Sequence, residues 1–525
     1  MIIDLRNHPS PPPLEADVCI VGGGAAGICI AQELAGSPLR VLLLEAGGLE
    51  FDPASQDVYR GVNAGLPYFA LEEARLRFFG GTTNHWSGWC RPLDPIDFER
   101  RPWIEGSGWP ISYAELEPYF ARATRYAELP AETFRVEDWT DPGVRGEAAV
   151  TPLPLGEESF STIIYEFSPP TRFGSRYRNT LQAAENVTVL LNAYVTELIA
   201  AADGGRITTA RVAPTPTQRL DVQARLFVLA TGGIENARIL LLSRSVHTNG
   251  IGNEYDLVGR YFADHVELAS GYVLPTAQPE LLASYMAGRP IALAGLRLSP
   301  AAQARVGCPG CAITFHPVVD YTESSAGFGS LRRLVRSAAQ GKVPERLLSD
   351  LANVVTDIDR LAAFGLRRAL GKPSDERLLM IMNRVETVPN RESRVTLDSS
   401  RDAFGLNRVR LEWRLSETDK RSVHATQMEL ARALGQAGLG RVLVEFGVNE
   451  PWPSVAQGGY HHMGTTRMSD DPKTGVVDRH CRVHGLHNLY IAGSSTFRTT
   501  GVANPTLTIL ALALRIADRI KEELA

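Results

Sequence analysis

Two side chains near the C-terminus have the chemistry needed to act on an alcohol. His461 lies in the segment Gly459–Met468, and Asn504 directly precedes Pro505. A neutral imidazole can accept a proton near neutral pH, and a carboxamide N–H can hold the oxygen that loses it. The pair therefore predicts proton removal from a hydroxyl group, with His461 as the base and Asn504 as the group that orients the substrate.

The residues after Asn504 predict a buried helix that ends the chain. Pro505 falls at the expected first helical position, where a missing N–H costs nothing. The stretch from Thr506 to Ile520 is largely apolar. The first turn of such a helix has free N–H groups and a partial positive charge, so we expect it to face a group that gains negative charge.

A dinucleotide-binding fingerprint lies near the N-terminus. A buried strand at 17–21 leads into a glycine turn and a helix, and a second buried strand at 41–44 ends at Glu45. In this pattern the glycines permit the tight turn, the approach of a pyrophosphate and the packing of helix on strand. Glu45 is placed to accept hydrogen bonds from ribose hydroxyls. These glycines are Gly22, Gly24 and Gly27, and the motif alone fits FAD or NAD.

A second glycine-rich block spans Leu76–Trp89. Gly80 and Gly81 permit a backbone turn against a flat ligand, and the polar and aromatic residues Asn84, His85 and Trp86 follow at once. The alternative is an aromatic loop of the core that holds no ligand.

Together, the N-terminal fingerprint, this block and the pattern His461-x-x-Gly464-Thr465 followed by Asn504-Pro505 resemble the glucose–methanol–choline (GMC) oxidoreductases. The likeness is greatest to the branch that holds pyranose oxidase, fructose dehydrogenase and glucoside 3-dehydrogenase. It implies FAD as the cofactor. It also implies an α/β, Rossmann-like FAD-binding domain that is interleaved with an α+β substrate domain built on an antiparallel sheet.

The resemblance implies domain boundaries as well. The FAD-binding domain takes residues 1–110, 181–270 and 451–525, and the substrate-binding domain takes 111–180 and 271–450. Alternating patterns at 384–388, 394–397 and 408–413 predict half-exposed strands of a sheet that walls the substrate cavity. Residues 120–180 are poorly periodic and predict loops and short strands.

Further cofactor contacts are implied by the family pattern alone. Val195 matches a position that meets the adenine, and Gly493 and Ser494 match one that meets the ribityl-phosphate. The remaining implied contacts are Gly81, Asn84, His85, Pro505 and Thr506.

Two histidines leave alternatives open. In pyranose oxidase a histidine in a similar context carries the flavin covalently, so the likeness allows a covalent bond at His85, although we expect noncovalent binding. The family often has proline after the catalytic histidine, whereas His462 stands here. We assign the base to His461 and expect His462 to have a supporting or structural role.

Residues 331–372 carry nine Arg or Lys against four Asp or Glu, in a protein whose net charge is −5. Apolar residues recur at helical spacing from Leu347 to Ile358, which predicts a basic helical insertion at about 325–372. We expect it to cap the substrate entrance with a solvated basic face; docking on a membrane surface or on an acidic electron acceptor is the alternative.

Several clusters of metal or redox type are interpreted as structural. Cys308-Pro-Gly-Cys311 has no second pair, so we expect a turn with two reduced thiols, a functional disulfide being the alternative. His480, Cys481 and His484 follow a turn into a strand, and we expect no metal there.

Composition excludes some functions. A pI near 6.2 gives no electrostatic case for nucleic acid binding. Six cysteines in 525 residues predict no disulfide framework, and the N-terminus shows no signal peptide, so we expect a cytoplasmic protein. No apolar run reaches the roughly 18 residues of a transmembrane helix.

The leading hypothesis is FAD-dependent oxidation of a secondary alcohol of a sugar, glycoside or related polyol to a ketone, with hydride transfer to flavin N5. The alternatives are a lyase that keeps FAD as a scaffold, and a flavin subunit that passes electrons to a partner protein. Oxygen, a quinone or a redox protein could take the electrons. The substrate, the oxidised carbon and the oligomeric state stay open.

Overall fold

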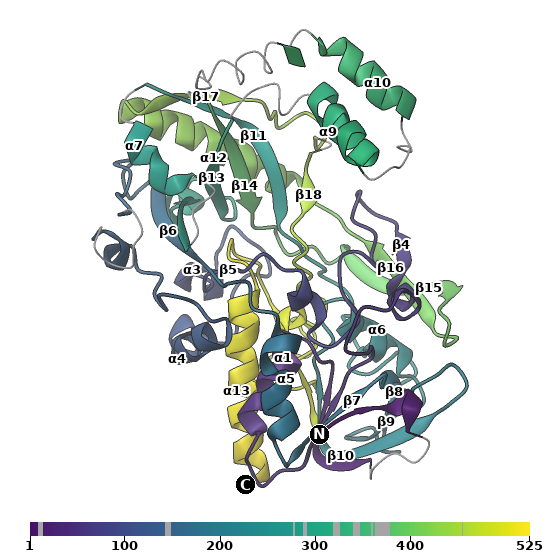
Figure 1. Ribbon diagram of the computed structural model, residues 1–525. Coiled ribbons are helices and arrows are strands. Elements are labelled where there is room, and N and C mark those ends of the chain that lie inside the picture. Colours follow the sequence, from purple (N-terminus) through teal and green to yellow (C-terminus); the bar gives the residue numbers. More distant parts are fainter. Residues whose placement is uncertain are drawn as a thin grey trace.

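The structure, a computed structural model, contains two large sheets joined by loops that cross between them repeatedly (Figure 1). It describes residues 1–8, 14–141, 149–276, 279–286, 291–318, 326–339, 347–358, 361–362, 378–453 and 455–525.

The first sheet has the strand order β1-β7-β3-β2-β10-β9-β8, with β19 paired to β10. Its central pairs are parallel, and their strands are buried on both faces, which explains their unbroken runs of Val, Ile and Leu. The strands are β1 (Ile2–Asp4), β2 (Glu15–Val21), β3 (Val41–Leu44), β7 (Val187–Leu191), β8 (Tyr194–Ala200), β9 (Ile207–Ala213), β10 (Leu220–Leu229) and β19 (Leu489–Ile491).

Helices from distant parts of the chain pack beside this sheet. The C-terminal helix α13 (Thr506–Leu524) contacts α1 (Ala25–Leu34) and α4 (Tyr113–Tyr126), and Figure 1 shows it beside α1 and α5 (Phe173–Ala183). A capping box starts α4, with Ser112 and Glu115 bonded reciprocally. A further helix, α6 (Glu235–Leu242), follows β10.

The prediction of loops and short strands over 120–180 is wrong in two places. The helix α4 continues to Tyr126, and residues Phe173–Ala183 form the helix α5, which packs on α1. The helix is amphipathic, with Phe173, Tyr177 and Leu181 buried at four-residue spacing. Three turns of this spacing are too short to stand out among the surrounding prolines.

The second sheet has the order β17-β11-β14-β13-β12-β6-β5, with β18 beside β11. All of its pairs are antiparallel, and α12 (Glu417–Gln436) covers part of it, as the α+β expectation requires. The strands are β5 (Trp89–Cys90), β6 (Phe160–Phe167), β11 (Val266–Pro275), β12 (Ala292–Leu298), β13 (Cys311–Pro317), β14 (Leu379–Val385), β17 (Gly440–Val444) and β18 (Gln457–Gly458).

Two of the three strands predicted for the cavity wall lie elsewhere. β15 (Arg394–Arg401) and β16 (Asn407–Glu412) form a separate three-stranded sheet with β4 (Gly61–Asn63). The tight parallel pairing of β4 with β16 explains this, since a Cβ at Gly61 would lie 2.5 Å from the Val409 carbonyl oxygen. Only β14 joins the wall. It ends at Val385, and the next side chain, Glu386, forms a buried ion pair with Arg101.

The basic insertion is helical where the structure describes it. It contains α9 (Ala326–Ala339) and α10 (Leu347–Thr356), and the rest of the predicted 325–372 insertion lies mostly outside the described residues. The remaining short helices are α2 (Pro53–Gln56), α3 (Pro95–Phe98), α7 (Pro279–Leu282) and α8 (Pro300–Val306). A search of the described helices for one that could span a membrane finds none.

Candidate active site

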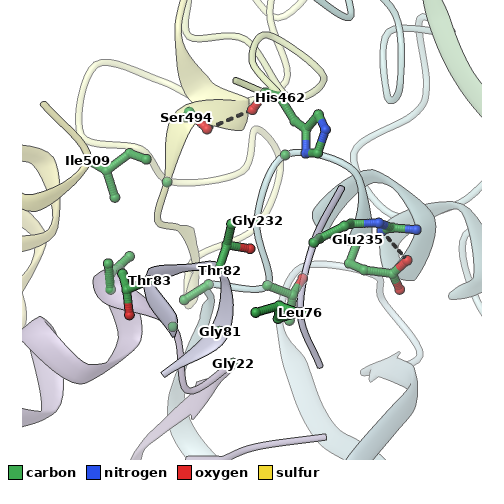
Figure 2. A pocket seen from close by; sticks show the side chains of 18 of the residues that line it. Gly22, Leu76, Gly81, Thr82, Thr83, Gly232, Glu235, His462, Ser494 and Ile509 are labelled. Carbon is green, nitrogen blue, oxygen red and sulfur yellow. Dashed lines mark hydrogen bonds and ion pairs between the residues drawn. The ribbon is translucent and has the colours of Figure 1, made fainter. Parts of the chain in front are cut away.

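A cavity of about 580 Å³ lies against the first sheet. The N-terminal glycine turn, the segment after β10 and the C-terminal block all line it, and Figure 2 shows Gly22, Gly232 and Ser494 from these three parts of the chain. The discontinuous arrangement of the sheet thus brings together the motifs that the sequence separates by hundreds of residues.

Two of the three fingerprint glycines, Gly22 and Gly27, leave no room for a side chain. Gly22 has φ +110°, and a Cβ there would lie 2.5 Å from the Ala230 carbonyl oxygen. A Cβ at Gly27 would lie 1.9 Å from the carbonyl oxygen of Gly22, so this glycine serves the packing of α1. At Gly24 and Gly493 a Cβ would meet no protein atom within 4 Å, because both border the cavity. The open glycines are therefore a cradle that a ligand can approach closely.

Two charged residues define the far part of this cavity. The buried Glu45 carboxylate accepts hydrogen bonds from the backbone N–H of Gly47 and Gly23, at 2.7 and 3.0 Å. Burial raises the pKa of Glu45 in spite of these bonds. Arg77 lies over the ring of Tyr194, and its Nε and Nη2 are buried with no protein partner. Unpaired donors in a cavity beside a carboxylate fit the phosphate and ribose oxygens of FAD. The sequence pattern did not indicate Arg77.

Most of the predicted cofactor residues line this cavity, and two do not. Asn84 is absent from the lining, since its Nδ2 donates to the Phe79 carbonyl oxygen at 3.0 Å and stabilises the turn instead. Gly27 lies behind the lining in α1. Those that do line it are Gly22, Gly24, Glu45, Gly81, His85, Val195, Gly493, Ser494, Pro505 and Thr506.

A second cavity, of about 320 Å³, lies against the antiparallel sheet and shares His461 and Asn504 with the first. These two side chains are adjacent, with His461 Nε2 3.3 Å from Asn504 Nδ2. The predicted pair therefore lies where the two cavities meet. A substrate in the second cavity would reach both side chains and the cofactor cavity.

His265, at the start of β11, determines which nitrogen of His461 carries the proton. His265 Nε2 lies 3.0 Å from the Gly501 carbonyl oxygen, which can only accept, so Nε2 carries a hydrogen. His265 Nδ1 is then an acceptor in the neutral ring, and it lies 2.8 Å from His461 Nδ1. His461 must donate from Nδ1, which leaves its Nε2 unprotonated and turned toward Asn504.

Arg384 fixes the amide of Asn504 in the same way. Its Nη1 donates to Asn504 Oδ1, so the Nδ2 group of that amide faces His461. Arg384 also donates to Glu267 at 2.7 Å, and the two residues stand directly opposite each other on β14 and β11. The cross-strand ion pair thus holds the orienting amide in place.

The protonation states agree with this assignment. Burial lowers the pKa of His461 well below its usual value. Electrostatic interaction with His265 and then with the Arg384 charge lowers it further. Burial lowers the pKa of His265 to about 4. Both rings are therefore neutral near pH 7, which the proposed tautomers require.

Asp264 holds the backbone of the segment that carries His461. Its Oδ1 accepts from the N–H of His461 at 2.9 Å and of Gly459 at 3.0 Å, and its Oδ2 accepts from the hydroxyl of Tyr68. Burial raises the pKa of Asp264 to about 7. The sequence pattern missed Asp264, His265, Glu267 and Arg384 alike; a polar Asp-His doublet just before a strand was the only available signal.

His462 lines the first cavity (Figure 2), together with His461. Its carbonyl oxygen accepts from Ser494 Oγ at 2.7 Å, and burial lowers the pKa of its ring to about 3. It has no contact with Asn504 like that of His461, which agrees with a supporting role.

The other clusters form neither a disulfide nor a metal-type group among the described residues. Cys308 and Cys311 are buried and are not disulfide-bonded. A search of the described residues finds no group of His, Cys, Asp and Glu that could hold a metal ion.

A parallel sheet with a glycine cradle, joined to a histidine and an amide at a second cavity, is the arrangement expected of a flavin-dependent oxidoreductase. Residues 17–249 match the family model "FAD dependent oxidoreductase", and residues 389–513 match "GMC oxidoreductase". The chain thus combines an FAD-dependent oxidoreductase domain with a GMC oxidoreductase domain, and it is an FAD-dependent oxidoreductase that acts on CH–OH groups.

Similar proteins extend over nearly the whole chain. The fructose dehydrogenase large subunit of Gluconobacter japonicus is 25% identical and covers 97% of this chain and 98% of its own. The paromamine 6'-oxidase of Streptomyces fradiae is 25% identical over 97% of this chain and 92% of its own. A solved structure of formate oxidase has a TM-score of 0.53, 17% identity and coverage of 98% and 99% of the two chains, and shows the shared fold.

Proposed function

We propose that the protein oxidises a secondary alcohol of a sugar, glycoside or related polyol to a ketone. The observation that carries this proposal is the contact between His461 and Asn504 where the cofactor and second cavities meet, with His461 Nε2 unprotonated. A base and a donor on one hydroxyl oxygen are the two groups that removal of a proton from that oxygen needs.

The residues would divide the reaction between them. His461 Nε2 accepts the hydroxyl proton, while Asn504 Nδ2 donates to the same oxygen and holds the adjacent C–H in position. FAD, when bound by the glycine cradle, supplies the acceptor of the hydride, so that one C–H and one O–H bond are lost and a C=O bond forms. The N-terminus of α13, which begins at Thr506 beside Asn504, provides a positive partial charge at this end of the cofactor cavity.

The second cavity supports a substrate with several hydroxyl groups. Glu267, Arg384 and His316 contribute polar atoms to its lining, and Trp89, Tyr165 and Tyr460 contribute aromatic faces. This combination of flat apolar surfaces and fixed polar groups suits a sugar ring. Because Glu267 and Arg384 neutralise each other, we propose a substrate that need not carry a compensating charge.

The names of the relatives agree with a sugar or glycoside substrate. Their names include a fructose dehydrogenase, a C-glycoside 3-oxidase and a pyranose 2-oxidase. The C-glycoside 3-oxidase of Arthrobacter globiformis is 35% identical over 26% of this chain. We propose the coarse class of substrate from this agreement and leave the oxidised carbon open.

Anaerobic mixing of the FAD-loaded protein with a panel of sugars, glycosides and polyols tests the proposal. We expect at least one of them to bleach the visible absorbance of the flavin and to yield a ketone detectable by mass spectrometry. If none of the panel reduces the flavin, while a simple primary alcohol or an aldehyde does, the sugar assignment is wrong.

We propose noncovalent binding of FAD. The exposed side chain of His85 lines the cofactor cavity, and its pKa is lowered chiefly by partial desolvation and further by Arg172. Acid precipitation of the protein should leave a colourless pellet and a yellow supernatant. A yellow pellet that becomes colourless on His85→Ala substitution would show a covalent bond instead.

A further inference from the structure

The helices α9 and α10 pack on each other through polar side chains. Asp350 accepts hydrogen bonds from Ser330 at 2.8 Å and from Arg333 at 2.6 Å. Asn353 donates to Ser330 at 3.1 Å, and the backbone N–H of Gly327 donates to the Asp357 carboxylate at 2.8 Å. Polar side chains thus bridge the two helices, and Asp350 among them is only 1% exposed.

The apolar residues of the same helices point outward. Leu348 of α10 is 84% exposed and Val355 is 65% exposed, and Val335 of α9 is 61% exposed. Spacing of three and four residues places the α10 side chains on one side of that helix, opposite Asp350 and Asn353. The exposed apolar residues of the pair and of the turn after α10, which we call the outward face, are Leu331, Val335, Leu347, Leu348, Leu351, Val355 and Ile358.

This set of exposed apolar residues is unusual for a globular protein. Exposed apolar side chains are normal when they are scattered, but six on two adjacent helices, with Ile358 just beyond α10, indicate a surface that another phase or molecule covers. Figure 1 shows α9 and α10 at the end of the molecule farthest from both chain termini, where such a surface is accessible.

The charge of this part of the chain indicates what covers the outward face. The segment 331–372 carries nine Arg or Lys against four Asp or Glu, whereas the whole protein has a net charge of −5. On α9 the exposed Arg332 and Arg333 follow Leu331 in sequence, and Arg333 is paired with Asp350. Exposed Leu, Val and Ile side chains, in a segment whose sequence has a net positive charge, complement a bilayer that has anionic headgroups and apolar chains. A second copy of this acidic protein would bring an equally basic surface against this one.

We propose that the outward face docks on an anionic membrane surface, with α9 and α10 lying in the headgroup region. This attachment is peripheral, in keeping with the search of the described helices for a membrane span. The pair is inserted between β13 and β14, which both contribute residues to the second cavity. Docking would therefore bring the substrate-binding part of the protein close to the bilayer.

Sedimentation of the FAD-loaded protein with lipid vesicles tests this inference. One set of vesicles is pure phosphatidylcholine, and the other contains one third phosphatidylglycerol. We expect binding to the second set and little to the first, with release by high salt because screening weakens the attraction. Equal binding to both sets, or binding to neither, would contradict the proposal.

Variants locate the contact. The double substitution Leu348→Ser/Val355→Ser should lower the partition onto the anionic vesicles about tenfold or more, because two apolar side chains lose their burial in lipid. Both positions are exposed, so flavin content and thermal unfolding should stay those of the natural protein. Met428→Ser, at a 51% exposed position of α12, is the matched control and should bind normally.

An unchanged partition of the double variant would overturn the assignment of the face. Light scattering without vesicles tests whether a second copy of the protein covers the outward face instead. If the natural protein is an oligomer that the double variant converts to monomers, and neither form binds vesicles, the outward face is an interface between copies and the membrane proposal is wrong.

Discussion

At His461, the direction of one hydrogen bond decides whether the ring can accept a proton from substrate. The carbonyl of Gly501 requires a hydrogen on His265 Nε2, and this makes His265 Nδ1 an acceptor for His461. A histidine with the opposite tautomer would present an N–H to the substrate and could not act as its base. His265 is thus a positioning residue for the proposed reaction.

The first prediction concerns the base itself. His461→Ala should lower kcat by about 10² or more, since general-base catalysis is typically worth that factor. FAD content should be unchanged, because the cradle glycines remain. Stopped-flow reduction by a confirmed substrate measures the loss. A variant that reduces its flavin at the normal rate would refute the assignment.

The second prediction concerns His265. In His265→Asn, Oδ1 can take the place of Nδ1 and still accept from His461, whereas His265→Leu leaves His461 Nδ1 without an acceptor. We expect kcat to fall at least about tenfold in the leucine variant and less in the asparagine variant. The ¹⁵N NMR signals of His461 provide a readout independent of turnover. Equal tautomer populations in both variants would contradict the role.

The third prediction concerns pH. Because burial lowers the folded-state pKa of His461, the neutral base persists below pH 6.5 and is lost only as pH falls through that lowered pKa. The acid limb of the kcat/KM profile should therefore lie below pH 6.5. An acid limb at or above that value would show that a different group limits the reaction.

At the scale of elements, the glycines of the turn after β2 serve two different purposes, the fold of the turn and the approach of the cofactor. Gly22→Ala would force a Cβ against the Ala230 carbonyl oxygen, whereas Gly24→Ala places its Cβ in open cavity. We expect the first variant to unfold at lower denaturant even without FAD. The second should unfold like the natural apoprotein and bind FAD more weakly. Calorimetry with and without FAD distinguishes the two, and normal FAD affinity in Gly24→Ala would show that the cofactor does not approach this glycine.

Elements also explain what the sequence could predict. The strand–turn–helix motif and the His461–Asn504 spacing are local patterns, so their chemistry was visible along the chain. Glu267 and Arg384 meet only because β11 pairs with β14, and no local pattern encodes that register. The prediction of β15 and β16 in the cavity wall is wrong for the same reason. An alternating pattern predicts a strand but does not show which sheet the strand joins.

At the scale of the whole molecule, a buried ion pair ties the loop after α3 to the antiparallel sheet. Arg101 Nη1 lies 2.7 Å from Glu386 Oε2, and both side chains are 1% exposed. Arg101→Ala would leave the Glu386 charge buried without its partner. We expect a loss of about 3–5 kcal/mol in the free energy of unfolding.

Urea unfolding of the FAD-loaded protein measures this loss. The double variant Arg101→Met/Glu386→Leu is the control, because removing both charges avoids the unpaired carboxylate and should restore most of the stability. Equal losses in the single and double variants would mean that packing, rather than charge, accounts for the effect.

The positions of β19 and α13 along the sequence have a consequence for biosynthesis. The strand that pairs with β10, the helix that packs on α1, and both proposed catalytic side chains are synthesised more than 400 residues after the fingerprint glycines. A nascent chain that already carries the complete fingerprint still lacks the opposite wall of its cofactor cavity. We therefore expect full retention of FAD only after these segments have joined the sheet, and a chain without α13 would expose the apolar surface that α13 covers.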